Sequence, residues 1–241
     1  MDIRDFMHGT SAIGSVGAAF YFHPTTIAAA KEHGLDGFRL YFLGRGGVLG
    51  DVEARVVASA FGYFEPGLLA RMWDSAKAVM APRDAARLYL ECCHTVARQH
   101  LGDVEGLDEF CAAAETVNNA IDPAGLALYA GISAEPLADD APARALQLCT
   151  VLREARGSAH LVALVASGLS PRLAHLIRRP DDDKLFGWND QPAVGEDDRA
   201  RWAAAEELTD RLLEPAYSRL DERGQQAFLR GLDGMAATFA I

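Results

Sequence analysis

Hydrophobic residues recur with a helical period along most of this chain, and the clearest example is the segment Ala145–Arg179. Leu148, Val151 and Leu152 fall on one face of a helix. Gly157 follows that face, and glycine commonly marks the end of a helix. The pattern therefore predicts a first helix that stops near Gly157.

Two more helices are predicted within the same segment. Ser158 is placed to cap a second helix, which Gly168 ends. Ser170 caps a third helix with Pro171 at its first position, where a missing N–H costs nothing. The segment is thus predicted to form helix, turn, helix, turn, helix. The third helix carries four polar side chains: Arg172, His175, Arg178 and Arg179.

The rest of the chain also favours helices, predicted over residues 26–33, 52–61, 66–73, 83–100 and 107–120. Residues 37–43 (GFRLYFL) fit a strand or a helix. The glycine- and serine-rich start predicts a flexible arm over residues 1–19, with a short helix as the alternative. Prolines and glycines mark residues 123–141 as a linker.

Composition supports an all-α fold class. Alanine and leucine dominate while β-branched residues are sparse. With 241 residues, half of them hydrophobic, the chain can bury one large core or two small ones.

A faint internal repeat bears on that choice. The sequence of Val56–Met72 resembles that of Val162–Ile177. In the alignment Gly62 matches Gly168, and Pro66 matches Pro171 after one inserted residue. Chance similarity between alanine-rich helices is the alternative. The repeat predicts two similar helical units in tandem, residues 20–122 and 142–241, which pack as a pseudo-dimer with a pocket between them.

The net charge limits the classes of binding partner, and the cysteine content indicates the redox compartment. The net charge of −11 and the pI near 5 disfavour general adhesion to nucleic acid or to an anionic membrane, although one local basic face can still bind DNA. The four cysteines lack a CxxC spacing, which suits a reducing compartment. No signal peptide or spanning run is visible, so we expect a cytoplasmic protein without a membrane partner. The sequence leaves the oligomeric state open, and no cofactor is expected.

Two motifs resemble a family of actinobacterial proteins known only as helix-turn-helix proteins. Its first signature is roughly Tyr-Phe-x-Gly-Arg-Ala-Ala-Pro-Leu-Gly. The residues of this chain that match it are Tyr41, Phe42, Gly44, Arg45, Leu49 and Gly50, whereas Gly46, Gly47 and Val48 depart from it. Its second, Leu-Arg-Glu-x-Arg-Gly-x-x-His, is matched by Leu152, Arg153, Glu154, Arg156, Gly157 and His160. The resemblance covers residues 20–235 and implies winged-helix-like units related to regulators of the multiple-antibiotic-resistance type.

The basic helix after Gly168 is the candidate DNA-contacting surface. Set into a major groove, it would present Arg172, His175, Arg178 and Arg179 to phosphates and base edges. The alternative is a solvated basic helix end, favoured by the helix dipole. Residues 181–183, all aspartate, would repel the DNA backbone.

A second group of residues suggests a small-molecule site. Glu154 and His160 are candidates for acid–base chemistry, and the candidate ligand-binding residues are Tyr41, Arg45, Arg153, Arg156 and Trp188. The excess of arginine predicts an anionic small molecule with a carboxylate, phosphate or enolate oxygen. A purely structural ion-pair network is the alternative. The glycines around Arg45 fit an anion-binding loop or a tight turn between helices.

The adjacent Cys92, Cys93 and His94 point in different directions on a helix, so core cysteines are predicted rather than a metal site. From these observations we expect a helix-turn-helix-like protein that binds a small molecule. One form of this expectation is a transcriptional regulator whose DNA-binding surface is degenerate. The alternatives are a cofactor-independent enzyme acting on an anionic metabolite between the units, and a scaffolding protein.

Overall fold

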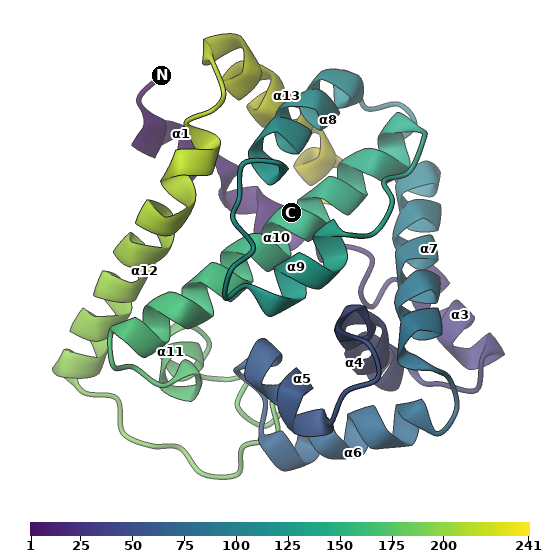
Figure 1. Cartoon of the computed structure of the whole chain (residues 1–241), viewed down its shortest axis with the longest axis vertical. Coiled ribbons are helices and arrows are strands. Elements are labelled where there is room, and N and C mark those ends of the chain that lie inside the picture. Colours follow the sequence, from purple (N-terminus) through teal and green to yellow (C-terminus); the bar gives the residue numbers. More distant parts are fainter.

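The computed structural model describes residues 1–241, and every regular element in it is a helix (Figure 1). The all-α prediction is confirmed. Because no strand is present, the β-hairpin of a winged helix is absent, and the expected likeness to winged-helix units extends to helices alone. The α-helices are α1 (Ile3–Gly9), α2 (Ile13–Val16), α3 (Pro24–Glu32), α4 (Gly37–Gly46), α5 (Ala54–Phe61), α6 (Pro66–Lys77), α7 (Pro82–His100), α8 (Leu107–Asn118), α9 (Ala127–Ser133), α10 (Ala141–Ala166), α11 (Pro171–Arg178), α12 (Glu196–Tyr217) and α13 (Glu222–Thr238); η1 (Thr10–Ala12) and η2 (Gly47–Leu49) are 3₁₀ turns.

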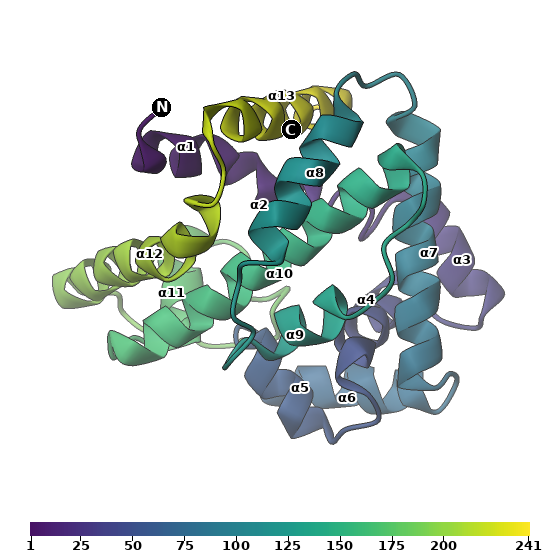
Figure 2. The ribbon, with the colours of Figure 1, turned by 45° about the horizontal axis from the view of Figure 1, so that its top comes forward.

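Helix α10 runs through the centre of the molecule (Figures 1 and 2). It packs against α2, α7, α8, α9 and α12, and most of its side chains are buried. A helix covered on nearly all sides carries apolar residues on most of its faces, which explains why its sequence shows little amphipathic contrast. No single helix of the chain is both long and apolar enough to cross a membrane, although the bent α10–α11 pair reaches that length and composition.

The helix break predicted at Gly157 is wrong. Helix α10 continues through Gly157 for 26 residues, because buried neighbours on both sides, including Ala155 and Ser158, hold it in the core. Glycine within a helix costs about 1 kcal/mol relative to alanine. Packing of this length of buried helix outweighs that cost.

Replacing Gly157 with alanine is therefore expected to stabilise the protein by about 0.5–1 kcal/mol, because a Cβ there meets no atom within 4 Å. The free energy of unfolding from urea denaturation measures this. A loss of stability in Gly157→Ala would contradict a continuous α10.

The N-terminal segment is helical and packed, in contrast to the predicted flexible arm. Phe6 and Val16 are fully buried, and the Phe6 ring contacts the rings of Tyr217 and Phe228. Gly17 lies where a Cβ would meet the carbonyl oxygen of Cys149 at 2.6 Å. The glycines that suggested flexibility here permit close approach to α10.

The aromatic segment 37–43 forms α4, whose start is fixed by Asp36: the side chain accepts a hydrogen bond from the backbone N–H of Arg39 at 2.8 Å. The segment proposed as a linker contains α9, in which Leu128 and Tyr129 are buried. One cluster of 50 buried hydrophobic residues includes members from both predicted units, so the two halves share a single core.

Candidate functional site

A buried polar cluster joins α4 to α10. Arg45 donates from Nε and Nη2 to the two carboxylate oxygens of Glu154, each at 2.8 Å, and from Nη1 to the hydroxyl of Tyr41 at 3.1 Å. Arg153 and Tyr21 each donate to Oε1 of Glu154 at 3.0 Å. Four of the predicted site residues, Tyr41, Arg45, Arg153 and Glu154, therefore meet, and we call this group with Tyr21 the Arg45–Glu154 cluster.

The cluster carries surplus positive charge. Burial opposes ionisation of Glu154, but the charges and hydrogen bonds of Arg45 and Arg153 outweigh it and lower the pKa of this carboxyl to about 2. Burial raises the pKa of Tyr21, which stays protonated. Two guanidinium groups thus face one carboxylate.

A small, partly enclosed cavity of about 20 Å³ lies beside this cluster. Its polar lining includes Arg45, Glu154 and Tyr89, and apolar side chains from α7 and α9 complete it. The Tyr89 hydroxyl is buried and has no hydrogen-bond partner. A cavity of this size holds about one water-sized group.

Arg156 and His160 point to a different partner helix, α12. Arg156 pairs with Glu206 at 2.6 Å, and His160 Nδ1 lies 2.9 Å from the hydroxyl of Thr209. Burial lowers the pKa of His160 although Glu206 opposes the shift, so its imidazole is neutral near pH 7. The predicted single site therefore divides into two clusters, and His160 does not line the cavity.

The C-terminal end of α10 forms a helix-turn-helix with α11. Gly168 takes a positive φ of 68°, and the Ser170 hydroxyl accepts the backbone N–H of Leu173 at 3.2 Å. The axes of α10 and α11 differ by 113°, within the range of this motif. The predicted turn and the start of the third helix are confirmed. A separate small core supports the motif and consists of Ala163, Leu164, Leu169, Ala174 and Ala205.

The loop between α11 and α12, residues 179–195, covers the polar face of α11. The Arg172 guanidinium lies 4.2 Å from the centre of the Trp188 ring and pairs with Asp190. His175 is buried with its ring 3.9 Å from that of Phe186. The loop therefore covers Arg172 and His175, and contact of these two residues with DNA stays a prediction. Only Arg178 and Arg179 remain exposed.

The model of the helix-turn-helix family matches residues 8–185, which is most of the chain. This protein belongs to the helix-turn-helix family. No curated protein and no solved structure matches it. The family match supports the coarse resemblance read from the two motifs, and it includes both the Arg45–Glu154 cluster and α11.

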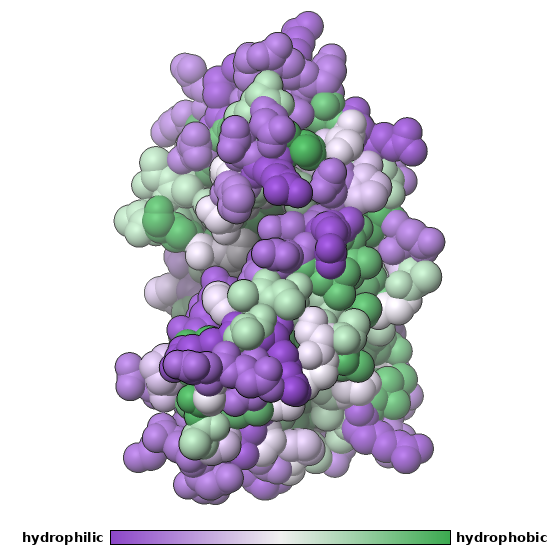
Figure 3. Space-filling model, turned by 90° about the vertical axis from the view of Figure 1, so that its left-hand side faces the viewer, coloured by the Kyte–Doolittle hydropathy of each residue, from purple (hydrophilic) through white to green (hydrophobic).

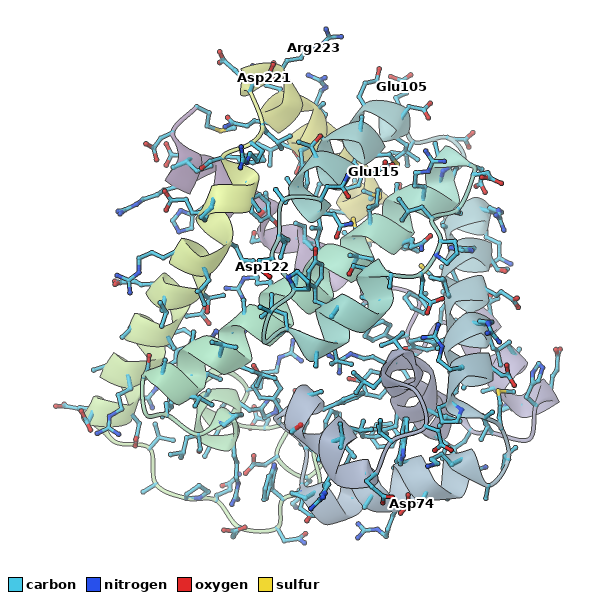
Figure 4. All side chains as sticks on the ribbon, in the orientation of Figure 1. Asp74, Glu105, Glu115, Asp122, Asp221 and Arg223 are labelled. Atoms are coloured by element: carbon cyan, nitrogen blue, oxygen red, sulfur yellow. The ribbon has the colours of Figure 1, made fainter.

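The face of the molecule drawn in Figure 3 is mainly hydrophilic. On the side formed by α12, hydrophobic residues appear in patches among hydrophilic ones (Figure 3). Asp74, Glu105 and Asp221 are exposed and point outward at the edges of the molecule (Figure 4). With a net charge of −11, non-specific attraction to DNA is weak.

The glycines around Arg45 allow close helix packing. A Cβ on Gly44 would lie 2.6 Å from Cβ of Tyr89 on α7, and one on Gly47 would collide with the carbonyl of Pro82. Gly50 has a φ of 83°. These contacts favour the tight-turn interpretation over an anion-binding loop.

The cysteines are free and buried as predicted, and no group of three or more His, Cys, Asp or Glu residues is placed to hold a metal ion.

Several functional residues were missed by sequence reasoning. Tyr21 lies just after the predicted arm, Tyr89 and Thr150 lie on buried helices, and Glu206 lies far along the chain from Arg156. The excess of arginine, from which we predicted an anionic ligand, is met in part by Glu206. Nothing in the sequence singled out Tyr89.

Proposed function

We propose that this helix-turn-helix protein is a regulator whose helix α11 is directed to DNA and whose response is set by a small anionic molecule at the Arg45–Glu154 cluster. One observation carries the proposal. Glu154 belongs to the same continuous helix, α10, that ends at the turn into α11. A ligand that moves this part of α10 acts directly on the position of α11.

The charge balance supports an anionic ligand. Arg156 and His160 are satisfied by Glu206 and Thr209, and Trp188 stacks on Arg172, so these residues leave the proposed ligand site. Tyr41, Arg45 and Arg153 remain, with one carboxylate between two arginines. A buried surplus charge favours a ligand of opposite sign.

The covering loop supports a regulated rather than permanent DNA interaction. Trp188 fastens the loop by donating its Nε1–H to the carbonyl of Tyr63 at 2.9 Å. Asp183, however, is 2 % exposed and neither carboxylate oxygen has a partner. A buried unpaired carboxylate is costly, so the closed loop is held with little free energy to spare. Release of the loop would free Arg172 for phosphate contact.

Trp188→Ala is accordingly expected to bind the protein's own upstream DNA roughly tenfold more tightly than the unaltered protein, because the open form ceases to be a minor population. Mobility shift at low salt measures this, and the affinity should fall as salt rises. Leu185→Ala, at an exposed position of the same loop, is the matched control and should leave binding unchanged. A folded Trp188→Ala protein that does not bind DNA would exclude the DNA-directed role.

The alternative of a cofactor-independent enzyme is less well supported. Its proposed acid–base residues, Glu154 and His160, contact different partners. Glu154 is held ionised by two arginines, and His160 is 7 % exposed. Neither is placed to exchange a proton with a shared substrate.

We also propose that residues 20–122 and 142–241 arose by duplication. Gly62 and Gly168 both have a positive φ, and each is followed by a capped helix that begins with proline. The next helices correspond in order, α7 with α12 and α8 with α13, and α8 packs against α13. This supports a pseudo-dimer, although the shared core means that neither unit is complete alone.

A further inference from the structure

The cavity beside the Arg45–Glu154 cluster lies between α4, α7, α9 and α10 and is partly enclosed. Its walls are largely apolar and include Phe20, Leu90, Leu128 and Ile132. The volume of about 20 Å³ admits one water-sized group. Any guest is therefore a single small ion or one end of a larger molecule.

Tyr89 provides an unused hydrogen-bond donor at this cavity. The residue is 5 % exposed, and its hydroxyl has no partner. Its ring centre is 5.6 Å from that of Tyr21, while its Cβ packs against Gly44, so the ring cannot easily turn away. Burial raises the pKa of Tyr89, which keeps the proton on the hydroxyl.

The groups around the cavity lack acceptors rather than donors. The two oxygens of Glu154 already accept four hydrogen bonds, from Arg45 twice, Tyr21 and Arg153. Glu135, the other carboxylate in the lining, pairs with Arg83. Arg45 uses three of its five N–H groups, so donors remain on Arg45 as well as on Tyr89.

We propose that this cavity is a binding site for a monovalent anion of about halide size, held between the hydroxyl of Tyr89 and the guanidinium of Arg45. The anion supplies the missing acceptor and offsets the surplus positive charge of the cluster. This inference rests on the proposed function only for the sign of the ligand's charge. The same place would accept the carboxylate end of a larger molecule, which the experiment separates from a free halide.

The full-length protein in sodium gluconate, at constant ionic strength, provides the test. Gluconate is replaced stepwise by chloride, bromide or formate while the midpoint of thermal unfolding is followed. A saturable rise in the midpoint is expected, since a ligand that binds only the folded state stabilises it. A rise with halides identifies a free ion, and a rise with formate alone identifies a carboxylate; both support the site.

Tyr89→Phe removes the hydroxyl and keeps the ring. It should fold and lose about tenfold in apparent anion affinity, the usual scale for one hydrogen bond to a charged group. Tyr217→Phe is the matched control, because Tyr217 is equally buried but packs against Phe6 and Phe228 elsewhere in the core. It should bind the anion as the unaltered protein does.

Crystals grown in bromide should show an anomalous peak beside Tyr89. The proposal is overturned if no anion gives a saturable shift, if Tyr89→Phe binds as tightly as the unaltered protein, or if the cavity in bromide crystals holds only water. Failure of Trp188→Ala to bind DNA would remove the proposed function and leave this result standing. Absence of anion binding would remove the cavity site and leave the DNA-directed role standing.

Discussion

Replacing Arg45 with alanine is expected to destabilise the protein by about 3–5 kcal/mol, because it leaves the carboxylate of Glu154 buried opposite a single remaining arginine. Glu154 is 2 % exposed, and Arg45 supplies two of the hydrogen bonds to it. Without Arg45 the buried carboxylate loses two of its four hydrogen bonds and one of its two counter-charges. The free energy of unfolding in urea measures the loss.

The double variant Arg45→Met with Glu154→Leu is the control. Replacing both groups by apolar side chains removes the buried carboxylate, and Arg153 is part-exposed and keeps its hydrogen bonds to Gly14 and Tyr21, so most of the lost stability should return. A pair that is buried as described also has an acid signature. The pKa of Glu154 is lowered from 4.5 to about 2, so its contribution is present above pH 4.5 and is lost as the pH falls toward 2. The double variant should lack this part of the pH dependence.

A loss below about 1 kcal/mol in Arg45→Ala would contradict a buried pair, since that is the range of exposed ion pairs. The result also bears on ligand assays. A protein variant that has partly unfolded cannot report on binding, and Tyr89→Phe is therefore the better probe of the adjacent cavity.

Gly47→Ala is expected to cost about 3 kcal/mol, at the upper end of the range for overpacked sites. A Cβ at Gly47 collides with the backbone carbonyl of Pro82, at the first residue of α7, and also approaches Ala86 at 3.2 Å. Backbone atoms cannot rotate aside, so the start of α7 must move away from η2. Denaturation in urea gives the change in stability.

Gly157→Ala is the matched control, because the same substitution on α10 meets no neighbouring atom and should stabilise. Opposite signs for the two variants would show that local space rather than helix propensity decides the outcome at each glycine. Equal small effects would mean that α7 and η2 are less closely packed than described. The departure of Gly46 and Gly47 from the family signature therefore has a physical consequence in this chain.

Local signals predicted the helices well where a cap was present. Ser170 with Pro171 marked the start of α11, and Gly168 marked the turn, because these residues act through their own backbone. Gly157 led to the wrong prediction of a helix end, because the sequence does not show that packing on both sides of a helix outweighs one residue of low helix propensity. Phe6 was hidden in a segment whose glycines suggested flexibility, and Tyr21 lies just after that segment.

The candidate site was predicted in part for a similar reason. Arg45 and Glu154 stood out because each lies in a recognisable motif, and the structure brings them together from α4 and α10. Pairing of Arg156 with Glu206 required knowledge that α12 lies beside α10. The burial of His175 required the loop 179–195, whose path over α11 no periodic pattern indicates.

The central position of α10 has a consequence for synthesis of the chain on the ribosome. A domain folds as a unit once its packing partners are present, and the first 140 residues here lack the helix around which α2, α7, α8 and α9 pack. Arg45 has no ion-pair partner until Glu154 on α10 has been synthesised. Phe6 gains its aromatic contacts later still, when Tyr217 and Phe228 have been synthesised. The nascent chain therefore exposes apolar helices for most of its translation, and chaperones that bind such surfaces have a long interval in which to act.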